Sequence, residues 1–126
     1  MDLDVDVDLD YPADVNFRKL DVYQTAVRFL PIAAAMADGL PPRYAAMAEQ
    51  LGRASLPVPL NIAEGSGKST GPDQRRFYSI ARGSAMECAA IIDACCALAL
   101  VEQPRAQEAD QLLLAAVRML SKMCRP

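Results

Sequence analysis

Apolar residues recur at steps of three and four along four stretches of this chain, and glycine or proline interrupts the pattern between them. The stretches cover residues 18–38, 42–64, 72–101 and 106–123. This spacing places apolar side chains on one face of an α-helix, while Gly39, Pro41, Pro42 and Gly65 are typical of helix ends. The sequence therefore predicts an all-α chain of four helices.

The connections between these helices are short, so consecutive helices should be antiparallel neighbours. We predict an up-down-up-down four-helix bundle over residues 17–126. Pro57 and Pro59 lie inside the second helix, where each removes an amide donor and clashes with the preceding turn. A kink or a short break is therefore expected between Ala54 and Leu60.

The third helix is too apolar for a bundle of this size. Residues 88–101 contain a single charged side chain, Asp93, and a helix that is apolar all round needs cover all round. We therefore expect the bundle to associate with copies of itself. The inward seams predicted for the first, third and fourth helices are Leu20, Tyr23, Val27, Leu30, Ala34; Phe77, Ala81, Ser84, Cys88, Ile91, Cys95, Leu98; and Ala109, Leu112, Leu113, Ala116, Leu120.

Composition excludes several classes of protein. A length of 126 residues fits one domain, and no uncharged apolar run approaches the roughly 20 residues of a membrane-spanning helix. The first ten residues carry five Asp and no base, the reverse of a secretory signal, so a cytoplasmic protein is expected. Histidine is absent and the four cysteines lack the spacing of a zinc site, which predicts reduced, buried thiols and no metal.

Charge is unevenly spread along the chain. Residues 1–14 hold six Asp and no Lys or Arg, whereas residues 15–126 hold 13 Lys and Arg against ten Asp and Glu. We interpret residues 1–16 as an acidic N-terminal arm, either solvated or docked in extended form on arginines of a neighbouring subunit. The mildly basic body permits a polyanionic partner without requiring one.

Residues 65–70, GSGKST, resemble the end of a phosphate-binding P-loop. The first glycine of that motif would fall at position 62, which is Ile62, and the segment follows a predicted helix instead of a strand. A turn is the better interpretation. Without a histidine or a close pair of carboxylates, the sequence predicts neither an enzyme nor a cofactor.

Polar residues of the second and third helices support two interpretations. If the turn is centred near residue 69, Glu64 lies beside Arg75 and Arg76, Arg53 lies near Glu87, and the small residues Gly83 and Ser84 let the two backbones approach. This would be a structural network that fixes the helix register. The alternative is a phosphate-binding surface, with RNA or DNA contacted by Lys68, Arg75, Arg76 and Arg82.

Three segments carry a resemblance to a known family: FRKLDVYQ (17–24), NIAEGSGK (61–68) and RFYSIARGSAME (76–87). Together they resemble the four-helix-bundle proteins encoded in intervening sequences of bacterial large-subunit ribosomal RNA genes. The chain is also similar to the accessory variability protein of diversity-generating retroelements.

The resemblance implies a homopentameric ring and nucleic-acid binding, with no established catalytic residue. It places the family motifs on Asn61, Glu64, Gly65, Lys68, Arg76, Phe77, Gly83, Ser84 and Glu87. The acidic arm departs from the family pattern. The expected function is a non-catalytic, homo-oligomeric (pentameric) scaffold with a nucleic-acid contact; the alternative is a protein-interaction adaptor that binds no nucleic acid.

Overall fold

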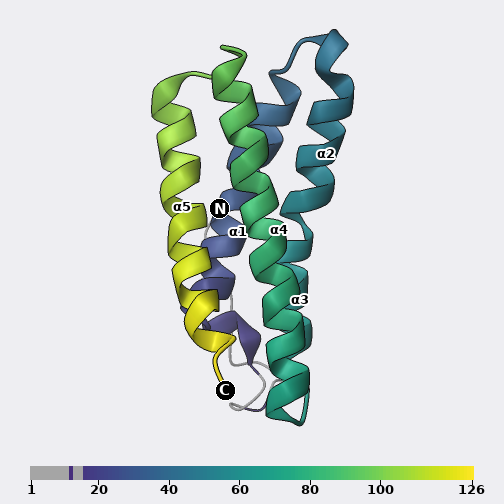
Figure 1. The fold of residues 1–126 in the computed structure, drawn as a ribbon, viewed down its shortest axis with the longest axis vertical. Helices are drawn as coiled ribbons and strands as arrows, with labels where there is room; N and C mark the ends of the chain where they lie inside the picture. Colours follow the sequence, from purple (N-terminus) through teal and green to yellow (C-terminus); the bar gives the residue numbers. More distant parts are fainter. Residues whose placement is uncertain (1–11, 13–15) are drawn as a thin grey trace.

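The computed structural model describes Pro12 and residues 16–126, and every regular element among them is helical. The elements are two 3₁₀ turns, η2 (Phe17–Lys19) and η3 (Pro42–Tyr44), and five α-helices, α1 (Asp21–Asp38), α2 (Ala45–Ser55), α3 (Pro57–Ser66), α4 (Gly71–Ala97) and α5 (Gln103–Met123). Because α2 and α3 follow one another along one side, the helices form four legs (Figure 1). The all-α prediction is confirmed; the predicted acidic arm lies almost entirely outside the described residues.

The second leg is broken where the sequence predicted. Leu56 separates α2 from α3, and Pro57 occupies the first position of α3. Pro57 and Pro59 have no amide hydrogen, so the carbonyls of Arg53 and Ser55 lose their usual helical donors. The two proline rings thus convert one long helix into two shorter ones.

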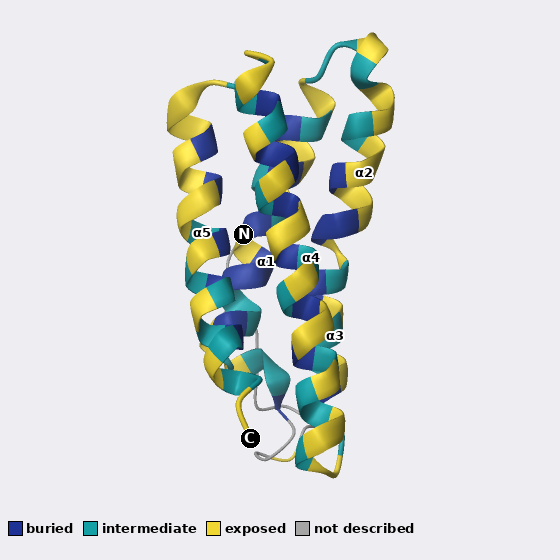
Figure 2. Ribbon diagram, in the orientation of Figure 1, coloured by how far each residue is buried: buried dark blue, intermediate teal, exposed yellow. Residues whose placement is uncertain are grey.

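The core lies along the bundle axis, between the legs (Figure 2). Helix α4 packs against both α3 and α5, and α1 packs against α5 and α2. Large, fully buried side chains come from all four legs: Phe29, Leu51, Ile62, Ile92 and Leu120. Most of the seam predicted for α5 is buried, since Ala109, Leu113, Ala116 and Leu120 all face the core.

The seams predicted for two other helices are partly wrong. In α4, Phe77 and Ser84 are only half-buried and Leu98 is exposed. The buried stripe of α4 is Tyr78, Ala81, Ala85, Cys88, Ile91, Ile92 and Cys95. In α1, the buried residues are Val22, Thr25, Ala26, Val27, Phe29, Ala33 and Met36, so only Val27 of the predicted seam is fully buried.

Helix α4 ends four residues earlier than predicted. Its C-terminus is a Schellman motif: the amide of Leu100 donates to the Cys95 carbonyl at 2.9 Å, and the amide of Ala99 donates to the Cys96 carbonyl at 3.0 Å. This geometry requires a left-handed residue, and Ala99 has a φ of 57°. This helix end could not be predicted from the sequence because glycine, the usual residue at the left-handed position, is absent.

All four cysteines are free thiols, as predicted, but only two are buried. Cys88 and Cys95 lie in the core, whereas Cys96 and Cys124 are half-buried. Burial, together with the charge of neighbouring Glu87, raises the pKa of the Cys88 thiol to about 12. Burial and the adjacent Cys96 also raise the pKa of Cys95.

Candidate nucleic-acid interface

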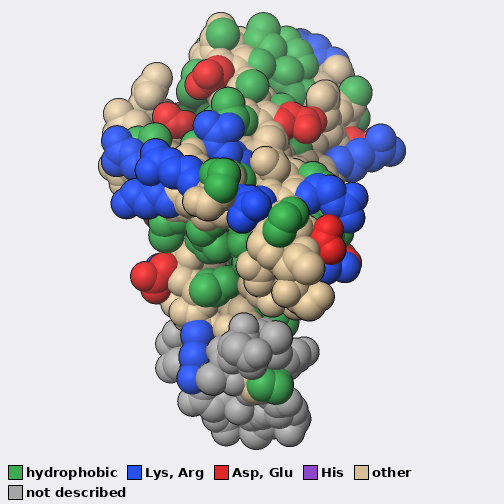
Figure 3. Space-filling view, turned by 60° about the horizontal axis from the view of Figure 1, so that its bottom comes forward, with side chains coloured by type: hydrophobic (Ala, Val, Ile, Leu, Met, Phe, Trp, Pro, Cys, Tyr) green, Lys and Arg blue, Asp and Glu red, His purple; other side chains and the backbone are tan. Residues whose placement is uncertain are grey.

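Charge is divided between the two ends of the bundle. One half, made of residues 16–29, 57–84 and 111–126, contains ten Lys and Arg but three Asp and Glu. The other half, residues 30–56 and 85–110, contains three Lys and Arg but seven Asp and Glu. We call these the basic half, with a net charge of +7, and the acidic half, with a net charge of −4. Figure 3 looks toward the basic half, where Lys and Arg side chains gather across several helices.

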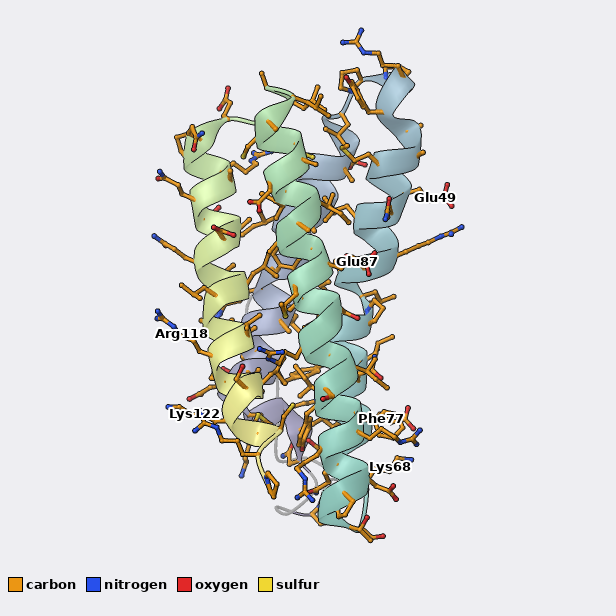
Figure 4. The ribbon with its side chains drawn as sticks, viewed as in Figure 1. Glu49, Lys68, Phe77, Glu87, Arg118 and Lys122 are labelled. Atoms are coloured by element: carbon orange, nitrogen blue, oxygen red, sulfur yellow. The ribbon has the colours of Figure 1, made fainter. Side chains whose placement is uncertain are left out.

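One group of cations surrounds Phe77 beside the α3–α4 turn (Figure 4). The Nζ of Lys68 lies 4.9 Å from the centre of the Phe77 ring, and the Cζ of Arg76 lies 4.7 Å from it. Both distances fit cation–π contact. Lys68 also pairs with Glu64 at 3.3 Å, so the predicted pairing of Glu64 with Arg75 or Arg76 is wrong.

The turn itself is held by close packing and short-range hydrogen bonds. A methyl group on Gly65 would lie 2.7 Å from Cε1 of Tyr78, so only glycine fits there without rearrangement. The hydroxyls of Ser66 and Tyr78 share a hydrogen bond at 3.4 Å. Thr70 caps α4 by accepting from the Asp73 amide at 3.3 Å. Because Tyr78 is buried, Phe77 is the aromatic ring available to a ligand here.

A second group of cations lies along α5. Arg82 turns toward this helix, and its Nε donates to Ser121 Oγ at 2.7 Å. Arg118 and Lys122 flank Ser121 in sequence and point outward (Figure 4), and Arg125 follows just beyond the end of α5. Arg118 and Lys122 are not among the contacts predicted from sequence; they lie four residues apart on α5, a spacing that places both side chains on one face of the helix.

The four predicted nucleic-acid contacts therefore divide into two groups. Lys68 and Arg76 meet around Phe77, and Arg75 lies over the same turn, since its Nη1 is 2.9 Å from the position of a Cβ on Gly71. Arg82 belongs with α5 instead. Within residues 16–126, no ion pair with a described carboxylate involves Arg75, Arg76, Arg82, Arg118, Lys122 or Arg125.

Other parts of the predicted network need correction. Arg53 pairs with Glu49 on its own helix and forms no ion pair with Glu87 in the described part of the chain, although both side chains line a groove between α2 and α4. Gly83 is exposed, and a methyl group there would meet nothing within 4 Å. It therefore does not serve close helix approach.

Asn61 and Ser84, two further residues of the predicted network, lie on α3 and α4. Asn61 has a local role: its Nδ2 donates to the Pro57 carbonyl at 2.8 Å and supports the start of α3. Ser84 is half-buried on α4, one position beyond Gly83.

Two further properties of the described residues bear on the site. No helix among them is long and apolar enough to cross a membrane. Nor does this part of the chain gather three or more acidic or cysteine side chains in a way that could hold a metal ion.

The helices, the division of charge and the cations around Phe77 together define a small helical-bundle protein with one strongly basic end. Residues 18–122 match the family described as 23S rRNA-intervening sequence protein, and the chain belongs to that family. No curated protein sequence matches it.

Proposed function

We propose that this chain is a non-catalytic, cytoplasmic scaffold: an up-down-up-down bundle that assembles into a homopentamer and contacts RNA or DNA through its basic half. The observation that carries the proposal is the charge division. A surface of net charge +7 attracts polyanions through counterion release, and affinity rises with the number of phosphates neutralised. The acidic half has the opposite sign, so a polyanion would approach one end.

The contacts that we propose are Lys68, Arg75, Arg76 and Arg82, extended by Arg118, Lys122 and Arg125. Such side chains hold a phosphate backbone without reading sequence. Phe77 adds an aromatic face between two cations, which suits stacking of an unpaired base. We therefore favour single-stranded RNA or DNA, bound with little sequence preference.

Self-association follows from apolar side chains that one bundle leaves exposed. Leu56 between α2 and α3, Leu60 of α3 and Ile80 of α4 are each about half-exposed, at 50%, 56% and 45%. On the other side of α4, Met86 and Leu114 are 48% and 49% exposed. A pentamer is what the family resemblance implies, and it would multiply the basic surface five-fold.

The test is the salt dependence of RNA binding. Fluorescence anisotropy with a labelled 20-nucleotide single-stranded RNA should give an affinity that falls steeply with salt. Replacing Arg76 and Lys122 by Gln should weaken binding and lower the log–log salt slope by about 1.4, the value for two phosphate contacts on a single strand. The matched control replaces Arg43 and Arg105 of the acidic half by Gln and should leave the slope unchanged. Equal effects of the two double variants would refute the proposed interface.

The alternative function, a protein-interaction adaptor, is favoured by a groove between α4 and α5. Its lining is mostly apolar and includes Met86, Leu113, Leu114 and Val117, a surface that suits an amphipathic partner helix. Capture of partners from lysate with and without nuclease separates the two functions. Partners lost on nuclease treatment support the nucleic-acid scaffold; partners retained support the adaptor.

A further inference from the structure

The two groups of cations point away from each other. In the view of Figure 4, Lys68 and Phe77 project on the side of α3, whereas Arg118 and Lys122 project on the outer side of α5. Helix α4 packs against both α3 and α5, so each group belongs to a different edge of the bundle. A short strand of nucleic acid that lies along one side of a chain therefore meets one group and misses the other.

Both groups stand at a similar height along the bundle axis. The hydrogen bond from Arg82 to Ser121, at 2.7 Å, sets the register of α4 and α5, and Lys122 is the next residue on α5. Phe77 lies on α4 below Arg82, and the difference in height between Phe77 and Lys122 is about 6 Å. A second copy placed alongside the first, parallel to it and without an axial shift, therefore has its α5 cations nearly level with the cations around Phe77 of the first.

The exposed apolar side chains suit this placement. The Sγ of Cys95 lies 3.5 Å from the Sδ of Met47, which sets the register of α4 and the second leg. Nine residues further toward the basic half, the second leg reaches Leu56 and α4 reaches Met86, so these two residues stand at about the same height. Both are about half-exposed, and Met86 lines the groove between α4 and α5. Leu56 of one copy can therefore enter the groove of the next copy without an axial shift.

On each edge of the bundle, a cation stands one helical turn from an exposed apolar residue. Arg76 precedes Ile80 by four residues on α4, and Arg118 follows Leu114 by four residues on α5. This spacing places the two side chains of each pair on one face of their helix. Contact between the apolar surfaces of two copies therefore also brings their cations together, and like charges that face each other across an interface repel. A polyanion between them removes this repulsion.

From this geometry we infer that the nucleic-acid site is shared between two copies of the chain. Lys68, Arg76 and Phe77 of one copy and Arg118 and Lys122 of its neighbour hold the same single strand, whose phosphates supply the negative charge that the two facing groups lack. Binding and assembly are therefore coupled: nucleic acid favours assembled chains, and assembled chains bind it more tightly. This inference rests on the proposed function and on the proposed self-association.

Mixing two weakened variants tests whether the site is shared. The K68Q/R76Q variant keeps the α5 cations, and the R118Q/K122Q variant keeps the cations around Phe77. Each variant alone should bind the 20-nucleotide RNA about tenfold more weakly than the wild-type chain, the scale expected for two lost phosphate contacts. Where the two variants meet in one assembly, a junction can hold both groups intact. Co-expressed variants, purified through a different tag on each, should therefore regain tight binding in fluorescence anisotropy.

The matched control is the wild-type chain co-expressed with the K68Q/R76Q/R118Q/K122Q variant, because this mixture has the same average charge. A shared site predicts that both mixtures regain tight binding. A site within one chain predicts that only the control mixture does, and this result would overturn the inference, as would the failure of mixed assemblies to form. A wild-type chain that binds no RNA would instead refute the proposed function itself.

Discussion

Gly65 and Gly83 have similar helical surroundings in sequence, but the space around them differs. Next to Gly65 stands the ring of Tyr78, which a methyl group would approach to 2.7 Å, whereas Gly83 has open space within 4 Å. In a helix, alanine is intrinsically better than glycine by about 1 kcal/mol. Packing therefore decides the effect of an alanine on stability at position 65, and helix propensity decides it at position 83.

We predict that Gly65→Ala lowers the free energy of unfolding by about 1–3 kcal/mol, the usual cost of overpacking. Gly83→Ala should raise it by about 0.5–1 kcal/mol. Urea denaturation followed by circular dichroism measures both. Stabilisation by both substitutions would show that the Tyr78 ring moves aside freely.

Thiol reactivity should follow the burial of the four cysteines. With iodoacetamide at pH 8.5, Cys96 and Cys124 should be labelled in the native protein, while Cys88 stays protected. Cys88 remains protonated far above that pH because its pKa is raised to about 12 by burial and by Glu87, and only the thiolate reacts. Peptide mass spectrometry identifies the labelled residues, and labelling of Cys88 at the rate of Cys124 would contradict its placement in the core.

The ion pairs were the least predictable residue-scale feature. Sequence reasoning placed Glu64 and Arg53 against the facing helix, yet both pair with a residue four positions away on their own chain segment, Lys68 and Glu49. An i,i+4 pair is always within reach on a helix, whereas a pair across helices needs the correct register. The register differs from the predicted one: Gly65 lies opposite Tyr78, and Met47 accepts a hydrogen bond from Cys95 at 3.5 Å.

At the scale of elements, prediction succeeded at several boundaries that proline or glycine marks, although Gly65, expected just beyond the second helix, lies inside α3. The end of the first helix and the break at Leu56 follow directly from such residues. Prediction failed where several stripes fit one helix. In α1 and α4, alanine and other apolar residues occur on neighbouring faces, so spacing alone could not choose the face; the bulk of Phe29 and Ile92 in the core decides it.

The end of α4 gives an element-scale prediction. Ala99 has a φ of 57°, a conformation that costs an L-residue about 1 kcal/mol and costs glycine nothing. Ala99→Gly should therefore stabilise the protein by about 1 kcal/mol, less the extra backbone entropy of the unfolded chain. The melting temperature, compared with that of Ala97→Gly within the helix, provides the test; Ala97→Gly should destabilise. A loss of stability in Ala99→Gly would contradict the Schellman ending.

At the scale of the molecule, the basic half could not be seen in the sequence. Its cations come from three separate segments, and only the folding of four legs brings them to one end. The cations of residues 68–82 were identified from sequence because they are close together along the chain. Arg118, Lys122 and Arg125 join the same half only through the packing of α5 on α4. Arg82 links the two groups by its hydrogen bond to Ser121.

Apart from Leu98, which follows the end of α4, the large exposed apolar residues come from two different parts of the bundle. We call Leu56, Leu60 and Ile80, from α3 and its neighbours along the chain, the α3 face; Met86 and Leu114, which line the groove between α4 and α5, are the α5 face. A two-fold dimer needs one self-complementary surface, whereas a ring needs two different surfaces that meet head to tail. Two separate faces therefore favour a ring, as the proposed pentamer requires.

This arrangement predicts the outcome of a mixing experiment. Leu60→Glu should disable the α3 face and Leu114→Glu the α5 face, so each variant alone should sediment as a monomer at micromolar concentration. An equimolar mixture retains one intact α3 face and one intact α5 face, which can join once but cannot close a ring. Sedimentation velocity of the mixture should therefore show a 1:1 heterodimer and nothing larger. A mixture that stays monomeric would show that the two faces do not meet, and a wild-type chain that sediments as a folded monomer would remove the ring altogether.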